Sequence, residues 1–154
     1  MHSRWQGLRA RLINFYPPLL GAGIRVVDTA PDYRTLRVQM KLTWLNRNIV
    51  GTHFGGSLYA MCDPWFMLIL MRALGGAYIV WDKAATIRFL KPGRGTVTAT
   101  FHIAAEQIAE LRARADRGEK IEPTFAADVV DDAGNVIAQV EKLLYVRKKN
   151  ANGK

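Results

Sequence analysis

The sequence predicts an α+β fold in which a curved antiparallel sheet of about six strands wraps around one long buried helix. Three observations support this fold class. The segment 58–74 is almost wholly apolar, so a helix formed there has no polar face and must be buried on all sides. Strand-like segments lie before and after it, several with alternating apolar and polar residues. A sheet curled around the helix hides the helix surface.

The predicted strands are separated by short turn sequences. The run 30–32 (APD) supplies the first turn, and the run 131–135 (DDAGN) is a strong hairpin signal. An exposed helix is expected at 105–117, where apolar residues recur at helical spacing and a glycine follows the last turn. The central helix is expected to end at the glycine pair 75–76. The strands are predicted at 24–28, 36–42, 84–90, 96–104, 124–130 and 136–146.

A single domain, residues 1–154, is expected from the chain length and from a hydrophobic content of 49%. Its N-terminal helical segment, 1–22, has apolar residues at three- and four-residue steps before Pro17 and Pro18 end the helix. Those apolar residues are Trp5, Leu8, Leu12 and Phe15. The tail 148–154 is expected to be disordered.

Composition limits the compartment and the partners. The one cysteine, Cys62, allows no intrachain disulfide, and with no signal peptide in view it favours a reducing, cytoplasmic location. No membrane span is expected, because the apolar helix is short of about 20 residues and is interrupted by Asp63, Pro64 and Arg72. The net charge of +9 suggests an anionic partner, but the basic residues form no dense block. The charge is interpreted either as a solvated basic surface or as a site for a phosphate-bearing ligand. Nucleic-acid binding is less well supported, because no basic stripe with interleaved aromatic residues is present.

The stretch 48–76 carries the most informative motif. Its polar and glycine positions resemble the Asn…His-Gly-Gly…Asp pattern of hotdog-fold acyl-CoA thioesterases, and they are Asn48, Gly51, Gly55, Gly56 and Asp63. Two further stretches agree with that family: 86–95 looks like a strand that ends in a basic-Pro-x-basic-Gly turn, and 130–138 resembles its final hairpin. The chain thus resembles this superfamily, in particular its phenylacetate-pathway type, and more closely an uncharacterised bacterial branch of unknown function.

One position departs from the family pattern. The family usually has a histidine immediately before the glycine pair, whereas Phe54 stands there in this chain and His53 comes one residue earlier. A shift of one residue in a turn changes the direction of the ring. The role of the family histidine therefore does not transfer directly to His53.

The resemblance implies thioester hydrolysis, with coenzyme A as part of the substrate and no other cofactor. The backbone N–H groups of Gly55 and Gly56, at the helix start, are candidates for an oxyanion hole. Asp63 is the candidate general base or nucleophile, and the sequence leaves both roles open. Asn48 is expected to orient the water or the acid, although an Asn in a loop is often only a turn residue.

The glycine pair and the acid are separated along the helix. Asp63 lies about two turns after the glycines, roughly 10 Å away at 1.5 Å per residue, so one copy of the chain does not obviously bring them together. The resemblance supplies a solution, since the family's sites lie at a dimer interface. A homo-oligomer, either a dimer or a dimer of dimers, is therefore predicted.

Seven residues are predicted to contact substrate, each with an ordinary structural alternative. The basic residues either meet the ligand, its phosphates above all, or are solvated, and Lys83 is also a possible partner of Asp63. The apolar residues line a channel for the acyl chain, and the histidine either assists proton transfer or holds a loop. The seven are His53, Phe54, Lys83, Lys91, Arg94, Phe66 and Met67.

Other chemistries are less well supported. Cys62 is interpreted as a small apolar residue, and Ser57 does not fit a nucleophile elbow because Tyr59 occupies the last glycine position. No zinc spacing, P-loop or dinucleotide motif is present, so no metal is implied. Two alternatives stay open: a hotdog enoyl-thioester hydratase or dehydratase that uses His53 and Asp63, and a non-catalytic acyl-CoA-binding or regulatory module.

Overall fold

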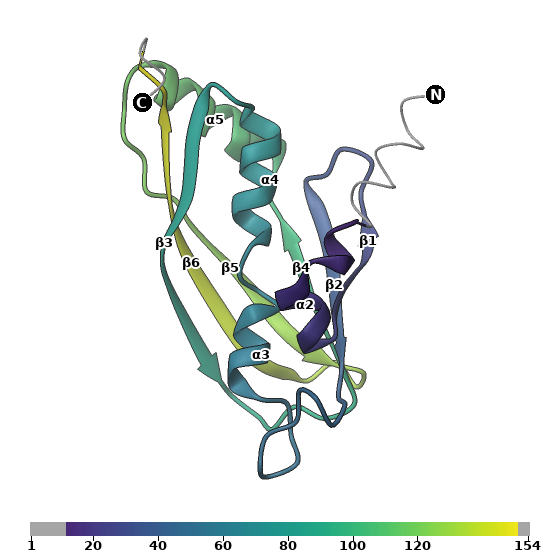
Figure 1. Ribbon diagram of the computed structural model, residues 1–154. Helices are drawn as coiled ribbons and strands as arrows, with labels where there is room; N and C mark the ends of the chain where they lie inside the picture. Colours follow the sequence, from purple (N-terminus) through teal and green to yellow (C-terminus); the bar gives the residue numbers. More distant parts are fainter. Residues whose placement is uncertain (1–11, 151–154) are drawn as a thin grey trace.

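The computed structural model describes residues 12–150 and confirms the predicted α+β arrangement (Figure 1). One antiparallel sheet of six strands, in the order β1-β2-β4-β5-β6-β3, curls around a central helical segment. The strands are β1 (Ile24–Thr29), β2 (Thr35–Lys41), β3 (Tyr78–Phe89), β4 (Thr96–His102), β5 (Thr124–Asp131) and β6 (Val136–Lys148). The helices are the short 3₁₀ helix η1 (Ile13–Phe15), α2 (Pro17–Ala22), α3 (Gly55–Ala60), α4 (Trp65–Leu74) and α5 (Ala105–Asp116).

The central helix is interrupted, so the prediction of one continuous helix over 58–74 is wrong. Pro64 is the reason, because it has no N–H to donate to the carbonyl of Ala60 and its ring crowds that carbonyl. The chain turns between α3 and α4, and the indole Nε1 of Trp65 donates to the carbonyl oxygen of Met61 at 2.7 Å. A side-chain hydrogen bond therefore stabilises the break between α3 and α4, and the predicted catalytic acid, Asp63, lies within this break.

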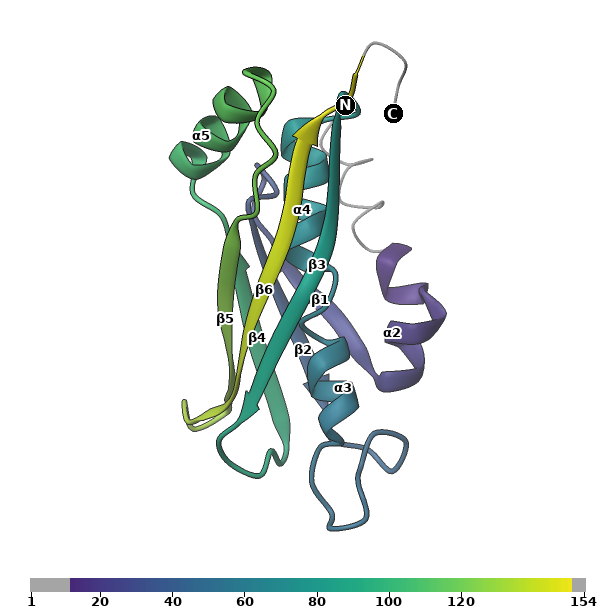
Figure 2. The same ribbon diagram turned by 90° about the vertical axis from the view of Figure 1, so that its left-hand side faces the viewer.

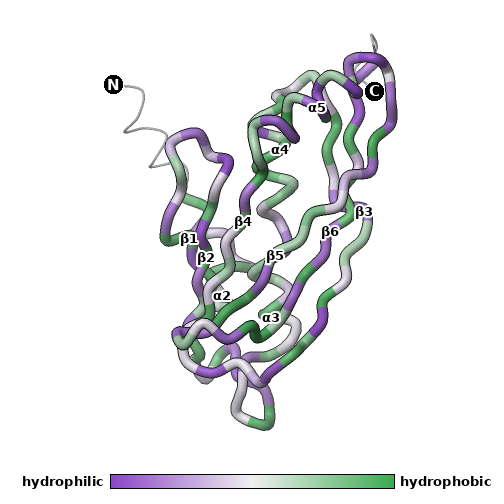
Figure 3. The backbone as a smooth tube through the Cα atoms, turned by 180° about the vertical axis from the view of Figure 1, so that it is seen from behind, coloured by the Kyte–Doolittle hydropathy of each residue, from purple (hydrophilic) through white to green (hydrophobic). Residues whose placement is uncertain are grey.

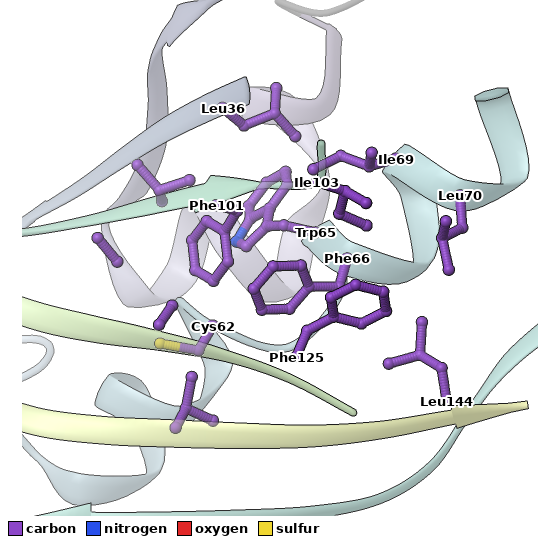
Figure 4. Packing of buried hydrophobic residues seen from close by; sticks show 14 of the residues in the cluster. Leu36, Cys62, Trp65, Phe66, Ile69, Leu70, Phe101, Ile103, Phe125 and Leu144 are labelled. Carbon is purple, nitrogen blue, oxygen red and sulfur yellow. The ribbon is translucent and has the colours of Figure 1, made fainter. Parts of the chain in front are cut away.

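The core lies between α4 and the inner face of the sheet (Figure 4). The ring of Phe66 stacks on Phe125 with centroids 5.1 Å apart and meets the edge of Phe101 at 5.2 Å. Trp65 packs beside Phe101, and Cys62 lies in the same apolar cluster. These contacts fix α4 against the sheet and hold the break between α3 and α4 in place.

The central segment is not buried on all sides, contrary to the prediction. Tyr59, Asp63 and Met67 are partly exposed, and Met71 is exposed. By length and composition alone the segment Gly55–Leu74 would pass as a membrane span, but 44% of its apolar window is buried inside the protein. Figure 3 shows hydrophobic and hydrophilic residues alternating along the strands that enclose it.

A β-bulge in β3 changes which side chains face inward. The register with β6 shifts between Asp82 and Ala84, so Lys83 is the extra residue. Before the bulge, Val80 and Asp82 lie opposite buried residues of β6, and after it Ile87 does. Because of this one additional residue, even-numbered side chains of β3 face the interior before the bulge and odd-numbered ones face it after the bulge.

Two strands run further than predicted and meet at one end of the sheet. β3 begins at Tyr78 rather than at Ala84, and β6 continues to Lys148, where a disordered tail was expected. The added segments pair with each other, and the ring of Trp81 stacks on Tyr145. α5 packs near this end, against α4 and β6 (Figure 2).

The N-terminal segment agrees with the prediction up to Pro17 and adds a second short helix after it. Tyr16 is extended between η1 and α2, so the helical turns before Pro17 end there as predicted. Pro17 also begins α2, because the first position of a helix needs no N–H donor and suits the fixed φ of proline. Trp5 and Leu8 lie outside the described residues, as do residues 151–154 of the predicted tail. Of the predicted helix before Pro17, the described chain holds helical Leu12 and the η1 turn that follows it.

Candidate active site

Asp63 belongs to a cluster of four polar side chains at the break between α3 and α4. Its Oδ1 accepts hydrogen bonds from the Nζ of Lys142 and from the hydroxyl of Tyr59, both at 2.7 Å. The same Nζ lies 3.2 Å from the Tyr59 hydroxyl oxygen and 3.3 Å from Oδ2 of Asp82. Asp63, Lys142, Tyr59 and Asp82 are called the ion cluster below.

Each member of the ion cluster is placed by its backbone. Tyr59 stands four residues before Asp63, and this spacing along a helical segment brings the two side chains together. Lys142 occupies an inward position of β6 between Val140 and Leu144, and its side chain is fully buried. The bulge in β3 completes the cluster by aiming Asp82 inward.

The charges in the cluster depend on one another. Burial alone raises the pKa of Asp63, but the hydrogen bonds from Lys142 and Tyr59 and the Lys142 charge hold that pKa below its ordinary value. Burial lowers the pKa of Lys142, and its bonds to Asp63 and Tyr59 and the nearby carboxylates raise the pKa by more. Burial raises the pKa of Asp82, which Lys142 only partly offsets. At neutral pH, Asp63 is therefore a carboxylate beside an ammonium group.

The two oxygens of Asp63 are in different situations. Oδ1 holds both hydrogen bonds, whereas Oδ2 accepts none from the described part of the chain. The side chain is 48% exposed, although its partner Lys142 is 0% exposed. The arrangement presents an ionised, oriented carboxylate with one oxygen available to a ligand or to water.

The sequence analysis missed three members of the ion cluster, Lys142, Tyr59 and Asp82. A signal was present for Lys142, because it stands in step with the apolar residues Ala138, Val140, Leu144 and Val146, which face the core. The lysine considered as a partner for Asp63, Lys83, instead pairs with Glu122 on the exposed side of the sheet. As the extra residue of the bulge, Lys83 points away from the ion cluster.

A groove of about 610 Å³ lies at the other end of α3 and is called the α3 groove below. Five of the predicted site residues line it, together with apolar side chains of α3, of the loop before it and of the end of β3. The five are Asn48, His53, Gly55, Lys91 and Arg94. Asp63 is not among the residues that line the groove, so the structure separates the two predicted halves of the site.

His53 holds the floor of the groove. Its ring is buried, and with its Nε2 protonated it donates to the carbonyl oxygen of Gly95 at 3.0 Å. The backbone N–H of His53 donates to the carbonyl of Gly93 at 2.9 Å. Burial lowers the pKa of the imidazole more than the bond to Gly95 raises it. Its Nδ1 is buried and has no partner among the described residues.

Asn48 uses its side chain to shape the loop before α3. Its Oδ1 accepts from the backbone N–H groups of Val50 and Thr52, and its Nδ2 donates to the hydroxyl of Thr52 at 2.9 Å. A further bond, at 3.3 Å, reaches the carbonyl oxygen of His53. The amide therefore orients the loop and makes no contact with Asp63.

The glycine pair begins α3, where two aromatic rings approach it. Gly55 and Gly56 occupy the first two helical positions, which have no intrahelical acceptor, and no side chain caps them. A Cβ at Gly55 would lie 3.0 Å from the ring of Phe89. A Cβ at Gly56 would overlap sterically with the ring of Phe54. With the rings in these positions, a side chain at Gly55 or Gly56 would require a ring to move, and Phe54 covers part of the donor end.

The other predicted contacts fall in different places. Lys91 donates to Oδ1 of Asn135 at 3.1 Å, and Arg94 donates to the carbonyl of Gly51 at 3.2 Å. Met67 lies partly exposed on the open face of the central segment. The ring of Phe66 is instead enclosed in the core, a position that does not open onto a channel in the single chain.

Cys62 directly precedes Asp63 but does not share its chemistry. The thiol is fully buried in the apolar cluster, and burial raises its pKa to about 12. A thiol with such a pKa is protonated at neutral pH and is a poor nucleophile. Among residues 12–150, no three His, Cys, Asp or Glu side chains are grouped to hold a metal ion.

Comparison with known proteins places most of the chain in one family. The family described as "Domain of unknown function (DUF4442)" matches residues 6–146. A comparison with curated proteins gives no significant match.

Solved structures share the fold. A Pseudomonas aeruginosa protein of unknown function, described as a probable thioesterase, superposes with a TM-score of 0.84 at 22% identity, covering 93% of this chain and 95% of that one. A thioesterase from Haemophilus influenzae gives 0.67 at 13% identity, with 90% and 87% covered. The PaaI protein from the phenylacetic acid degradation operon of E. coli gives 0.63 at 20% identity, with 97% and 95% covered. The fold is therefore the hotdog fold, as the sequence motifs predicted.

Proposed function

The chain belongs to the DUF4442 family, and we propose that it is a thioesterase that hydrolyses acyl-CoA or acyl-carrier thioesters with Asp63 as its reactive carboxylate. One observation carries the proposal: Asp63 is held through Oδ1 by a buried lysine and a tyrosine, while Oδ2 stays open. An oriented carboxylate of this kind is suited to activate water or to attack a carbonyl. The thioesterase descriptions of two fold neighbours agree with this reaction class.

Two routes lead from this carboxylate to the same products. As a general base, Oδ2 takes a proton from water while the water oxygen bonds to the thioester carbon. The C–S bond then breaks, and the proton held by Asp63 passes to the departing CoA sulfur, which restores the carboxylate. As a nucleophile, Oδ2 itself bonds to that carbon and expels the thiolate, which leaves a mixed anhydride. Water then hydrolyses the anhydride and restores Asp63. The low pKa of Asp63 keeps the ionised form ready in both routes.

Lys142 and Tyr59 prepare the carboxylate for this role. Lys142 supplies the compensating charge, since its ammonium group is fully buried and touches Asp63 directly. Tyr59 donates to the same oxygen, which fixes the plane of the carboxylate. Both act through Asp63 and are positioning residues.

The α3 groove is proposed to receive the thioester carbonyl. The N–H groups of Gly55 and Gly56 are free of helical acceptors, and a donor aimed at a developing oxyanion contributes about 2.7–4 kcal/mol to catalysis. Phe54 covers Gly56, so its ring must turn aside for both donors to be used. Lys91 and Arg94 at the groove suit the phosphates of coenzyme A, and Asn48 and His53 keep the loop in shape.

A homodimer would join the two halves of the site. Within one chain the α3 groove and the ion cluster lie at opposite ends of α3, which spans roughly 9 Å at 1.5 Å per residue. The central segment keeps an open face that includes Met67 and Asp63, and β3 is an unpaired sheet edge. We propose that the groove of one subunit faces Asp63 of the other and that the acyl chain lies beside Met67.

Substitution of Asp63 tests the proposal. In an assay of thiol release over a panel of acyl-CoAs, Asp63→Asn is expected to lower kcat by at least about 10² while circular dichroism stays unchanged. Asp128→Asn, an exposed acid on β5, is the matched control and is expected to keep full turnover. Retained turnover in Asp63→Asn would remove Asp63 from the mechanism.

Isotope labelling separates the two routes. After many turnovers in H₂¹⁸O, a nucleophilic Asp63 gains ¹⁸O, which mass spectrometry of the peptide containing it detects. An unlabelled Asp63 with ¹⁸O only in the acid product is given by a general base and also by hydrolysis of the anhydride at its acyl carbon. Hydroxylamine separates these two cases, because only an anhydride on Asp63 yields an aspartyl hydroxamate. Binding of acyl-CoA without thiol release would instead identify a binding module, and hydration of an enoyl thioester would identify a hydratase.

A further inference from the structure

Five large apolar side chains are exposed where the segment of η1 and α2 meets the loop between β2 and α3. Their exposed fractions lie between 49% and 79%. Figures 1 and 2 both place the end of α2 beside this loop. Exposed apolar side chains that gather in one place mark an interaction site, whereas single ones are ordinary surface. The five, called the α2 patch below, are Phe15, Tyr16, Leu20, Trp44 and Leu45.

The α2 half of the patch is exposed because of the way this segment is anchored to β1. The side chain of Asn14 exchanges two hydrogen bonds with the backbone of Val26, since its Oδ1 accepts from the N–H at 2.8 Å and its Nδ2 donates to the carbonyl at 3.2 Å. Leu19 is buried in the core. Tyr16 and Leu20, one helical turn apart, therefore remain together on the outer side of α2.

The loop half of the patch is held in place by one buried amide. The Nδ2 of Asn46 donates to the carbonyl oxygens of Ala22 and Lys41, both at 2.9 Å, and the side chain is almost fully buried. These bonds tie the loop to the end of α2 and to the end of β2. Trp44 and Leu45, directly before this amide, are therefore kept exposed next to α2 by a fixed backbone.

The segments that carry the α2 patch contain basic residues and no acid. Neither Asp nor Glu occurs in 12–27 or in 33–62. Arg25 follows α2, whereas Lys41 and Arg47 stand on either side of the exposed loop residues. None of these three forms an ion pair with a residue in the described part of the chain. The patch therefore combines apolar side chains with positive charge that the protein does not neutralise.

The contacts proposed for the homodimer do not use the α2 patch. α2 packs against β1, and β1 and β3 are the opposite edges of the sheet. No residue of the patch lines the α3 groove or belongs to the ion cluster. A second subunit that meets the groove, the open face of the central segment and β3 therefore binds elsewhere on the protein.

We propose that the α2 patch docks the protein peripherally onto an anionic lipid bilayer. Tryptophan and tyrosine rings favour the boundary between lipid and water, because each ring is apolar and carries one polar group. Phe15, Leu20 and Trp44 enter this boundary, and Lys41 and Arg47 contact lipid phosphates with their charged ends. The docking is measured with vesicles alone, so its outcome does not depend on thioester hydrolysis.

The test is flotation of the full-length protein with vesicles of phosphatidylcholine and phosphatidylglycerol in equal amounts. The parent protein is expected to float with these vesicles and to bind pure phosphatidylcholine at least about tenfold more weakly. Phe15→Ala/Trp44→Ala is expected to weaken binding by at least about tenfold, whereas Phe15→Leu/Trp44→Phe keeps most of it. Lys41→Gln/Arg47→Gln is expected to weaken binding by at least about fivefold and to reduce its salt dependence.

Two matched controls separate a built surface from general attraction to a basic protein. Trp81→Ala removes an exposed tryptophan on the opposite edge strand, and Lys120→Gln/Lys149→Gln removes two exposed charges distant from the patch in the sequence. Both are expected to float like the parent protein, with unchanged circular dichroism. The proposal is overturned if the parent does not bind the anionic vesicles, or if the controls weaken binding as much as the patch variants do.

Two other occupants of the patch would give different results. If the patch joins two copies of the chain, Phe15→Ala/Trp44→Ala lowers the molar mass in sedimentation and leaves flotation unchanged. If the arginines before η1 make the lipid contact instead, Arg4→Gln/Arg9→Gln/Arg11→Gln abolishes flotation and Phe15→Ala/Trp44→Ala does not weaken it. Either result overturns the proposal.

Discussion

Replacing Lys142 by methionine tests the energetic basis of the ion cluster. Methionine keeps an unbranched side chain in the buried row of β6 but removes the ammonium group. The carboxylates of Asp63 and Asp82 then face each other without the cation that touches both. The variant therefore asks how much of the folding free energy depends on that charge.

The expected loss follows from how deeply each partner is buried. Removing one member of a buried ion pair typically costs about 3–5 kcal/mol, because the other charge is left without compensation. Asp63 is 48% exposed, so water compensates part of its charge, and a loss of about 2–3 kcal/mol is expected. For a chain of this size that loss lowers Tm by about 4–12 °C.

The effect must depend on pH in a defined direction. In the parent protein the pKa of Asp63 lies below its ordinary value of 3.8, so its pairing stabilises the fold above about pH 4 and is lost as the pH falls through the folded pKa. Without Lys142, burial raises the pKa of both carboxyl groups, and protonation relieves the repulsion. The difference in Tm between parent and Lys142→Met is therefore largest near pH 7 and narrows towards pH 4.

Thermal unfolding followed by circular dichroism from pH 4 to 7 measures this difference. Lys83→Met is the matched control, since it breaks an exposed ion pair with Glu122 and is expected to cost less than about 1 kcal/mol. Equal stability of Lys142→Met and the parent at every pH would show that the charge of Lys142 contributes nothing. A loss that does not vary with pH would assign the effect to packing of the lysine stem.

Three further predictions concern single side chains. Tyr59→Phe removes one of the two donors to Asp63, so kcat for thiol release should fall about tenfold and the acid limb of its pH profile should move to higher pH. Because burial lowers the pKa of His53, the parent should lose stability as the pH falls from about 7 to 5, and His53→Gln should lack that part of the pH dependence in thermal melts. Cys62 should react with a disulfide reagent at pH 8 far more slowly in the folded than in the denatured protein, because burial raises the pKa of its thiol to about 12. Fast reaction of the thiol in the folded protein would contradict its burial.

Much of the fold is predictable because the relevant signals are local. Apolar alternation and turn residues locate strands such as β4 and β5, and an apolar stretch without a polar face identifies the helical segment that the sheet must enclose. The break in that segment was also predictable, because a proline inside a helical pattern, here Pro64, interrupts the helix. The start of β3 was missed because the run 78–83 mixes aromatic, apolar and charged residues without alternation.

The candidate site was predictable only in part, because it depends on contacts between distant segments. Asp63 stands out in the sequence as a lone acid in an apolar stretch, but its partner Lys142 lies on another strand, and Asp82 reaches it through a bulge. Local reasoning chose Lys83 because it is near in sequence to the central helix. The enclosure of Phe66 by Phe101 and Phe125 likewise follows from how α4 packs on the sheet, which periodicity alone does not specify.

The bulge at Lys83 has a consequence for how the family could diverge. Deletion of Lys83 would still allow β3 to pair with β6. It would, however, reverse which side chains face inward in one of the two segments of β3 that flank the bulge. Either Asp82 would turn outward and lose its contact with Lys142, or Ile87 and Phe89 would move to the outer face of the sheet and uncover the start of α3. A single-codon deletion would thus be an abrupt evolutionary step that separates descendants with an intact ion cluster from descendants with an intact groove wall.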